Sequence, residues 1–437
     1  MALAVSIDYA SALAMLEGLE GRGMKLGLER TEALLGALGD PHRRLRGVLV
    51  AGTNGKGSVC ALVEAMARAA GRHTVLLTKP HLASWCERIA LDGQPIPPQR
   101  FADLVALVLD AAAGIGGELG SPTVFEVLTV AGIVAARDAA PDLVICEVGL
   151  GGRLDSTNVL DLGVAVVTGI AQDHRQQLGD DMAGIAAEKA AIIKPGNDVV
   201  TAADSLALEV VREAAERAGA ASFTALGSGV RWWGEDRGRQ GVGVEIDEPR
   251  LALTTPLLGA FQQRNLAVAA HSARALHRRG IPIPDPAMVA GAETVRWPGR
   301  MQWIEGSPPV LVDCCHNTEA VQAMVAAALR LGGGHRTVAV FGIMADKDLD
   351  DMLAALRPLT AEVVFTAPRT ARAAAPEDLA ARWGAGARTA AGVDSALALA
   401  AAIAGVEGLV VAGGSLYVAG EALQALGALA RGLSASG

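Results

Sequence analysis

Residues 47–58, GVLVAGTNGKGS, decide how the N-terminal part of the chain folds. Residues 48–50 form a short apolar run typical of a buried parallel strand, and a glycine-rich turn follows directly. Beyond the turn, apolar residues recur at helical spacing from Val59 to Ala70. The amides of the turn and the positive end of the helix therefore converge on one place, which predicts a phosphate site.

The lysine in this turn, Lys56, adds a mobile charge that can follow the β- and γ-phosphates of a nucleotide. The general motif G-x-x-x-x-G-K-[ST] is nevertheless broken, because Val50 replaces its first glycine and Gly57 its hydroxyl residue. An ordinary tight turn between strand and helix is the alternative on local grounds. The predicted nucleotide contacts are Gly52, Thr53, Asn54, Gly55, Lys56, Gly57 and Ser58.

The segment G-T-N-G-K-G-S resembles the nucleotide loop of the Mur ligase superfamily, and the G-S after the lysine is similar to its dihydrofolate synthase/folylpolyglutamate synthase branch. Further matching motifs reach Ser415, so the resemblance covers essentially the whole chain. It implies an ATP-dependent amide ligase that adds L-glutamate to dihydropteroate or to folate (poly)glutamates through an acyl phosphate. ATP and two Mg²⁺ ions would be required.

The composition agrees with a globular protein of two or three domains. Its 437 residues are 51% hydrophobic and 19% charged, and no apolar run reaches the ~18 residues of a membrane helix. The net charge of −9 argues against general nucleic-acid binding. Five cysteines without metal-type spacing, and an N-terminus without a basic segment before its apolar residues, predict a cytoplasmic protein. We expect small-molecule partners and a monomer.

Lysine is rare in this chain, and arginine replaces it almost everywhere. Only six of the 38 basic residues are lysines. A lysine that persists in such a sequence indicates a site that needs a primary amine or a compact charge. By this criterion, Lys56 and Lys189 are the candidate functional lysines.

A metal site is predicted after the apolar strand at residues 143–148, because Glu147 near its end is costly to bury without a partner. The loop that follows, GLGGRLDSTN at 149–158, is nearly identical to a family motif. By resemblance, Glu147, His174 and a carbamylated Lys189 within E-K-A-A-I hold Mg²⁺. Only a primary amine can form the carbamate. The alternatives are a structural histidine and a surface ion pair at Lys189.

The family's magnesium-binding serine is replaced here, because Lys79-Pro80-His81-Leu82 stands where the family has Ser-Pro-His-Leu. An ammonium group cannot bind a cation. Water could therefore replace the serine on the metal, the ammonium could displace the metal, or Lys79 could point to solvent. The first of the two metal sites depends on which of these holds.

The substrate pocket is predicted by resemblance alone. Locally, residues 25–30 are a loop entering a helix, and T-x-F-E at 123–126 could be simple helix capping. The implied substrate-binding residues are Lys25, Leu26, Gly27, His81, Thr123, Val124, Phe125, Glu126, Leu154, Asp155, Ser156 and Ser415.

The expected fold class is α/β, with an N-terminal P-loop-type ATPase domain built on a parallel sheet and a C-terminal Rossmann-like domain. Short alternating runs at 222–255 predict a small antiparallel patch on the first domain. The segment RWPGR at 296–300 predicts domains at 1–297 and 298–437. By resemblance, Gln262, Asn265, Arg300, Asp313 and His316 contact the nucleotide. The acceptor glutamate would bind at the domain interface.

Two other functions remain open at this stage. One is a Mur-type ligase for a different carboxylate and amino acid, although no insertion for a nucleotide-sugar substrate is visible. The other is a catalytically weakened ATP-binding homologue, which the departure at Lys79 suggests.

Overall fold

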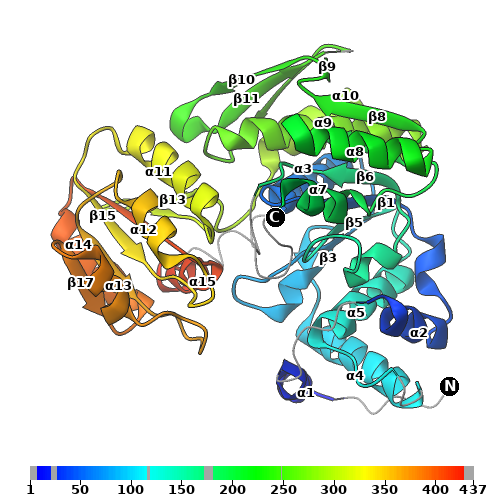
Figure 1. Ribbon diagram of the computed structural model, residues 1–437, viewed down its shortest axis with the longest axis horizontal. Coiled ribbons are helices and arrows are strands. Elements are labelled where there is room, and N and C mark those ends of the chain that lie inside the picture. Colours follow the sequence, from blue (N-terminus) through cyan, green and yellow to red (C-terminus); the bar gives the residue numbers. More distant parts are fainter. Residues whose placement is uncertain (1–6, 21–26, 116–118, 172–180, 248, 428–437) are drawn as a thin grey trace. The chain divides into compact units, whose positions relative to one another are not determined.

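The structure, a computed structural model, describes residues 7–20, 27–115, 119–171, 181–247 and 249–427 (Figure 1). The chain divides into two compact units, and each is described by itself. The first unit comprises Met1–Trp232, Ile246–Leu251 and Asn265–Ala292, and the second comprises Trp233–Glu245, Ala252–Arg264 and Glu293–Gly437. The domain boundary between residues 297 and 298 stays a prediction.

The first unit is built on a nine-stranded sheet with the order β4-β3-β2-β5-β1-β6-β7-β8-β9. Its strands are β1 Gly47–Ala51, β2 Thr74–Leu77, β3 Ile89–Leu91, β4 Gln94–Pro95, β5 Leu143–Glu147, β6 Gly163–Val167, β7 Asp198–Thr201, β8 Ser222–Leu226 and β9 Gly229–Val230. Strands β2, β5, β1, β6, β7 and β8 pair in parallel, and β3 runs antiparallel to β2. The predicted parallel sheet is therefore confirmed.

The central strand β1 is buried on both faces, as its uninterrupted apolar sequence predicts. Leu49 and Ala51 belong to a core cluster that contains the buried faces of α4 and α5, whereas Val48 and Val50 point to the opposite face. Helix α3 contacts β1, β2 and β5, but its apolar residues are absent from that cluster. It therefore covers the opposite face, and helices protect the sheet on both sides.

Helices α4 and α5 lie side by side in the first unit (Figure 1). The helices of this unit, with α9 beginning in the second, are α1 Tyr9–Glu20, α2 Glu29–Ala37, α3 Lys56–Ala69, α4 Pro98–Gly114, α5 Val124–Ala139, α7 Met182–Ala190, α8 Ser205–Ala218, α9 Phe261–Arg278 and α10 Asp285–Thr294. Short 3₁₀ turns lie at η1 Pro41–Arg44, η2 Trp85–Arg88 and η3 Ser156–Val159. None of the helices in the described residues is long and apolar enough to span a membrane.

The antiparallel patch expected at 222–255 is smaller than predicted. Strand β8 instead pairs with β7 in parallel and extends the large sheet. The reason is the preceding helix α8, which completes a strand–helix–strand crossover and returns the chain in the parallel direction. A separate three-stranded sheet contains β10 Trp232–Asp236, β11 Val242–Ile246 and β12 Leu251–Thr255. Most of its residues belong to the second unit, so the predicted attachment to the first domain is wrong.

The second unit contains a six-stranded sheet with the order β13-β14-β18-β15-β16-β17. Its strands are β13 Gln302–Ile304, β14 Val310–Val312, β15 Thr337–Phe341, β16 Val363–Thr366, β17 Ala387–Ala390 and β18 Leu409–Gly413. All pair in parallel except β13. Its helices are α11 Thr318–Gly332, α12 Leu349–Leu356, α13 Pro376–Trp383, α14 Val393–Ala404 and α15 Leu416–Ala425. The expected C-terminal α/β fold is confirmed.

Close packing of α10 on α3 generates a stability prediction. A Cβ on Gly291 would overlap the backbone of α3 at Met66. We expect Gly291→Ala to lower the free energy of unfolding by about 1–3 kcal/mol, because backbone cannot move aside as a side chain can. Gly18→Ala is the control, since open space surrounds Gly18 in α1, and it should be neutral or slightly stabilising. Urea denaturation measures the free energy of unfolding of both variants. If Gly291→Ala is as stable as Gly18→Ala, the close approach of α10 to α3 is contradicted.

Candidate active site

The turn at residues 52–55 connects the end of β1 to the start of α3, and glycine is required at both of its ends. Gly52 has φ of +145° and Gly55 has φ of +88°. A Cβ on Gly52 would overlap Thr168 Oγ1, and one on Gly55 would overlap the amide of Asn265. Gly55 also occupies the N-cap position of α3, where it has no side chain to cap the helix. The helix amides thus face the turn, as an anion site requires.

The turn is anchored to the segment that follows β6. The amide of Thr53 donates to the carbonyl of Gly169 at 2.9 Å, and its hydroxyl donates to the carbonyl of Ala171 at 2.9 Å. Thr168 Oγ1 donates to the carbonyl of Asn54 at 2.8 Å. These bonds fix the backbone of the turn, so its amides have a preset direction.

Two lysine amines meet at one carbonyl of this turn. Lys56 Nζ donates to the carbonyl oxygens of Gly52 at 3.1 Å and Thr53 at 3.0 Å. Lys189 Nζ, from α7, also donates to the Gly52 carbonyl at 3.1 Å. The Lys189 side chain is buried, so the alternative of a surface ion pair is wrong. The neighbouring Glu188 forms the ion pair with Arg153 instead.

The carboxylate of Glu147 lies at the end of β5, next to this turn. Glu147 is 5% exposed and is the register partner of Val50 on β1, two residues before Gly52. Its Oε2 accepts a hydrogen bond from the backbone amide of Lys79 at 3.1 Å. His174, the second predicted metal ligand, lies outside the described residues. Within those residues, no group of three or more His, Cys, Asp or Glu side chains could hold a metal ion.

The Lys79 side chain turns toward α5 rather than toward solvent. Its Nζ lies 3.4 Å from Thr129 Oγ1 and 4.2 Å from the centroid of the Phe125 ring. A cation over an aromatic face is stabilised by the ring quadrupole. The ammonium group therefore has partners of its own on α5, while the Lys79 backbone amide donates to Glu147.

The glycine-rich loop after β5 is organised around the buried carboxylate of Asp155. One oxygen accepts hydrogen bonds from the amides of Gly149 at 3.0 Å and Leu150 at 2.8 Å. The other accepts from the amide of Thr157 at 3.0 Å and its hydroxyl at 2.5 Å. A Cβ on Gly149 would overlap the Phe125 ring. The loop thus lies against the same aromatic ring that carries Lys79. Leu154 and Ser156 flank Asp155, and Ser156 is buried.

Residues 123–126 form a helix cap, which is the alternative to a substrate site that the sequence left open. Thr123 and Glu126 make a capping box at the start of α5, with Glu126 Oε2 accepting from the Thr123 amide at 2.7 Å. The nearly fully buried Glu126 also pairs with Arg30 of α2 at 2.9 Å. Val124 and Phe125 remain partly exposed in the first turn. Gly27 is described, whereas Lys25 and Leu26 lie outside the described residues.

His81 is held as a neutral ring. Its Nδ1 accepts a hydrogen bond from Arg88 Nε at 2.8 Å, and its ring centroid lies 4.7 Å from that of Trp85. Burial, reinforced by the nearby Arg88 charge, lowers the pKa of His81 to about 3. The remaining nitrogen, Nε2, therefore carries the proton and is a donor at neutral pH.

In the second unit, Asp313 fixes the turn after β14. Its two oxygens accept from the amides of Met301 at 2.9 Å and Cys315 at 2.8 Å. Burial raises the pKa of Asp313, while the charge of Arg300 opposes this shift. His316 Nδ1 lies 3.2 Å from the Cys314 carbonyl. Ser415 caps α15 by accepting from Val418 N at 3.2 Å, and Gln262 is fully buried in the first turn of α9.

The chain that carries these motifs is similar to known proteins over most of its length. Residues 101–273 match the Mur ligase middle domain, and residues 299–416 match the glutamate ligase domain of Mur ligases. The Bacillus subtilis (strain 168) dihydrofolate synthase/folylpolyglutamate synthase is 34% identical over 378 residues, which are 85% of this chain and 88% of that protein. The chain belongs to the dihydrofolate synthase/folylpolyglutamate synthase family.

Solved structures of this family superpose on the chain almost completely. The Mycobacterium tuberculosis folylpolyglutamate synthase complexed with ADP and AMPPCP has a TM-score of 0.89 at 32% identity, covering 96% of this chain and 99% of that one. The Yersinia pestis bifunctional folylpolyglutamate synthase/dihydrofolate synthase complexed with AMPPNP and Mn has a TM-score of 0.84 at 29% identity, covering 98% and 100%. The protein is therefore an ATP-dependent amide ligase of this type, and the predicted family, fold class and enzyme class are confirmed.

Sequence reasoning missed several side chains that hold the predicted residues in place. They are Arg30, Arg88, Thr129, Asn158 and Lys194. Arg30 and Glu126 are 96 residues apart, so no local pattern could pair them. The rarity of lysine could have drawn attention to Lys194, because the same criterion selected Lys56 and Lys189.

The depressed pKa of His81 predicts a pH dependence of stability. The unfolded chain protonates this ring near pH 6.5, whereas the folded protein does so only near pH 3. The unfolded state binds more protons between these values, so this stability is present above about pH 6.5 and is lost as the pH falls toward 3. We expect His81→Gln to make unfolding free energies, measured in urea from pH 4 to 7, less dependent on pH. The same substitution at the exposed His335 is the control. If the unfolding free energy of His81→Gln depends on pH as steeply as that of the wild type, the assignment is wrong.

Proposed function

We propose that the protein joins L-glutamate to dihydropteroate or to the terminal glutamate of a folate, and that the turn at residues 52–58 binds the ATP phosphates. The observation that carries this proposal is the convergence of the Lys56 and Lys189 amines on the carbonyl of Gly52, in the turn between β1 and α3. Its position at the carboxyl ends of parallel strands is where open α/β sheets bind ligands. The ATP analogues bound by the family's solved structures support the same assignment.

The reaction has two steps. A carboxylate oxygen of the pterin or folate substrate attacks the γ-phosphorus of ATP, the bond to the β-phosphate oxygen breaks, and ADP leaves. The α-amine of L-glutamate then attacks the acyl carbon, inorganic phosphate leaves with the bonding electrons, and the nitrogen loses a proton. Such a transfer needs positioning and charge stabilisation more than covalent help from the protein.

Lys56 is the residue that we assign to the transferred phosphoryl group. Its amine is now bonded to two carbonyls of its own turn, and a phosphate can replace these neutral acceptors with a charged one. Because the amides of the turn are already directed by the Thr53 and Thr168 bonds, little reorganisation is needed when the nucleotide binds.

We propose that a divalent metal binds beside this turn, with Glu147 as the ligand that the structure describes. Glu147 is a buried carboxylate, and oxygen donors are what Mg²⁺ prefers. We assign Glu147 and His174 to one ion and a carbamylated Lys189 to a second, with water in place of the family's serine because Lys79 contacts α5. When bound, the metal would neutralise charge on the phosphates. A carbamate on Lys189 keeps one N–H, so its bond to the Gly52 carbonyl is compatible with the modification.

The aromatic ring of Phe125 and the loop around Asp155 form the part of the first unit that we assign to the pterin. Phe125 is partly exposed and contacts both Gly149 and Lys79, so it is a rigid flat surface for a ring system. Thr123, Glu126 and Asp155 then act indirectly, because their polar atoms are used to hold this surface. His81 offers the Nε2 proton to the substrate.

The remaining proposed contacts are residues of the second unit and Asn265 of the first. We assign Arg300, Asp313 and His316 to the nucleotide, together with Gln262 and Asn265 of α9, and Ser415 to the substrate. Of these, Asp313 is bonded to backbone amides through both oxygens, so its role is to shape the turn that bears His316. We propose that the protein acts as a monomer.

The test is ADP release from ATP with dihydropteroate or tetrahydrofolate, each with and without L-glutamate. We expect sustained ADP release only with all three substrates. Lys56→Ala should reduce this rate by at least about 100-fold while thermal unfolding is unchanged, because the side chain stabilises transferred charge. A folded Lys56→Ala protein with normal turnover would remove the proposed phosphate site. A wild-type protein that binds ATP but releases no ADP would instead indicate the catalytically weakened homologue.

The carbamate on Lys189 generates a second prediction. Lys189→Arg keeps the positive charge but cannot form a carbamate, so we expect it to be nearly inactive. Lys189→Ala should recover part of its ADP release with added acetate or formate, because a small carboxylate can replace the missing anion. Mass spectrometry of the native protein under CO₂ would show the added mass. A fully active Lys189→Arg variant would show that the carbamate is unnecessary.

A further inference from the structure

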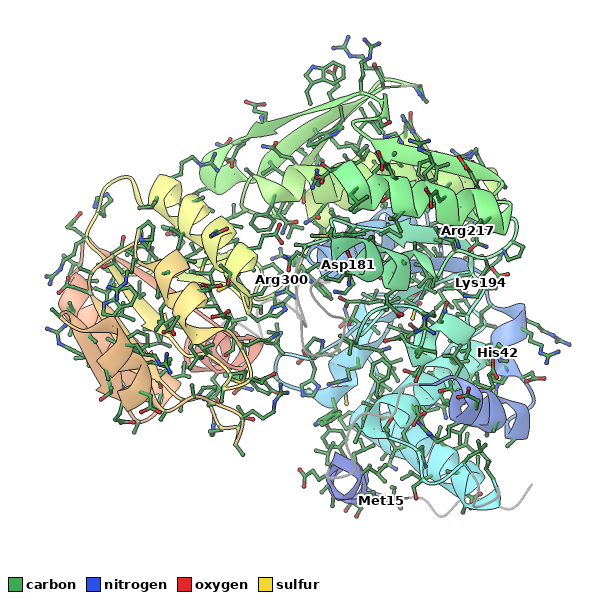
Figure 2. All side chains as sticks on the ribbon, in the orientation of Figure 1. Met15, His42, Asp181, Lys194, Arg217 and Arg300 are labelled. Carbon is green, nitrogen blue, oxygen red and sulfur yellow. The ribbon has the colours of Figure 1, made fainter. Side chains whose placement is uncertain are left out.

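Lys194, five positions beyond Lys189, makes a contact that the proposed reaction does not account for. Its side chain is labelled in Figure 2, and its Nζ donates to Asn158 Oδ1 at 2.8 Å. The side chain is partly buried, and Lys194 is one of only six lysines in the sequence. Burying an ammonium group is costly, so such a group is kept where its charge has a use.

The amide of Asn158 joins two parts of the proposed active site. Its Nδ2 donates to the carbonyl of Arg153, in the glycine-rich loop, at 3.1 Å. The same nitrogen donates to the carbonyl of Ala191, the C-cap residue of α7, at 3.3 Å. Helix α7 carries Lys189, so Asn158 connects the loop around Asp155 with the helix that supplies the second amine at Gly52.

The orientation of this amide depends on the charge of Lys194. An ammonium group has three donors and no acceptor, so the amide oxygen must face it. The NH₂ group then faces the two carbonyls and bonds both. If the amide were inverted, its oxygen would lie against two carbonyl oxygens, with three acceptors and no proton between them. The two carbonyls and the positive charge at Lys194 therefore favour the same orientation, the one that joins the loop to α7.

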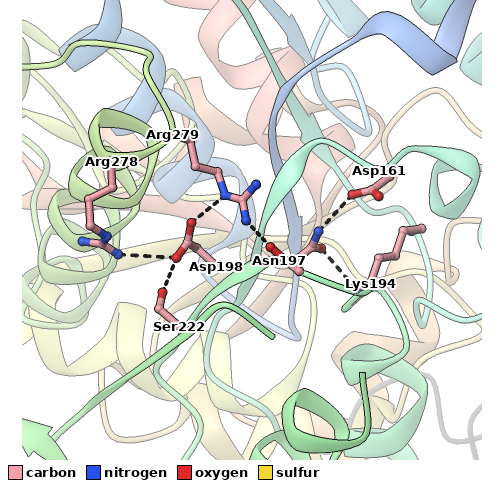
Figure 3. Close-up of polar contacts among 8 residues, drawn as sticks. Asp161, Lys194, Asn197, Asp198, Ser222, Arg278 and Arg279 are labelled. Carbon is pink, nitrogen blue, oxygen red and sulfur yellow. Dashed lines mark hydrogen bonds and ion pairs between the residues drawn. The ribbon is translucent and has the colours of Figure 1, made fainter. Parts of the chain in front are cut away.

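A second amide holds Lys194 itself. Figure 3 shows Asn197 between Lys194 and Asp161: the Lys194 amide donates to Asn197 Oδ1 at 3.1 Å, and Asn197 Nδ2 donates to Asp161 Oδ1 at 2.9 Å. Asp161 and Asn197 also line a surface hollow of about 310 Å³. Water reaches this end of the network, so protons can exchange with solvent without opening the core.

We propose that Lys194 is a positioning residue for the ligase reaction, which holds the Asn158 amide in the one orientation that joins the glycine-rich loop to the end of α7. This inference rests on the proposed function of the loop and of Lys189. Lys194 is not among the residues that we assign to the substrate. On this proposal it nevertheless fixes the position of the pterin-binding loop relative to the phosphate turn.

The charge of Lys194 changes within an accessible pH range. Burial lowers the pKa of Lys194 to about 8, and the nearby Asp161 carboxylate partly opposes this. The other charged groups of the surrounding network are Asp198, Arg278 and Arg279, and both arginines pair with Asp198 (Figure 3). A neutral amine donates a weaker hydrogen bond than an ammonium group, so above about pH 8 the amide of Asn158 is held less firmly in this orientation.

Activity and stability should then respond to pH in opposite directions. Above pH 8 the unfolded chain still binds the Lys194 proton up to about pH 10.5, whereas the folded protein does not. The contribution of this residue to the unfolding free energy therefore rises with pH over that window. The turnover number, in contrast, falls. A lysine with only a structural role would not separate the two quantities in this way.

The experiment compares the wild type with Lys194→Met, using ADP release and hydrogen exchange. We expect Lys194→Met to lower kcat about tenfold, the usual scale for a residue that orients an active-site group, with little change in KM for ATP. Its kcat should not show the decrease that the wild type shows near pH 8. Asn158→Leu should have a similar effect, and the double variant should be no worse than the poorer single variant. Arg217→Met, at an exposed arginine of α8, is the control.

Hydrogen exchange at pH 7.5 tests the positioning independently of turnover. Peptides covering residues 149–158 should exchange at least about threefold faster in Lys194→Met than in the wild type, while β1 and α3 are unchanged. Equal exchange and an unchanged pH profile of kcat in a folded Lys194→Met protein would overturn the proposal. If Lys194→Met does not fold, the proposal is tested with Lys194→Arg, which keeps the positive charge, and with the pH dependence of kcat in the wild type. A wild type without ADP release would refute the proposed reaction, and exchange would still test the link.

Discussion

The carbonyl of Gly52 is the acceptor on which the proposed active site depends. It receives hydrogen bonds from Lys56 at the start of α3 and from Lys189 on α7. The strand β1, the phosphate turn and the two helices are thus fixed to one another at a single oxygen. The buried carboxylate of Glu147 lies at the end of the neighbouring strand β5, at the same edge of the sheet. A phosphate that enters the turn can replace the carbonyl acceptors of Lys56, so the ligand completes the site.

The loop around Asp155 and the side chain of Lys79 both depend on Phe125. The ring limits how closely Gly149 can approach and supplies the face on which the ammonium group lies. A serine at position 79 could not reach Phe125 or Thr129. The replacement therefore gives α5 an additional contact with the strand end and leaves the Glu147 carboxylate in place through the Lys79 backbone amide. In this chain the lysine at position 79 adds packing to the site.

The fold could be predicted from the sequence where burial is complete. Strands β1, β2 and β5 have apolar residues on both faces, and only a parallel sheet covered by helices can bury them. The sequence predicts the wrong sheet for strand β8, because alternating apolar and polar residues are typical of a half-buried strand in any sheet. The turn glycines were predictable because φ near +90° or beyond excludes most other residues. Partners such as Arg30 for Glu126, or Lys194 for Asn158, follow from distances in space that a local pattern does not encode.

The loop at 149–157 folds around one carboxylate, and this has a consequence for how it meets a substrate. Four donors converge on Asp155, so residues on both sides of it are ordered together. The conformational entropy of the loop is lost when the chain folds, and a pterin that reaches Phe125 does not need to order it again. Discrimination between substrates then comes from the shape that it already has.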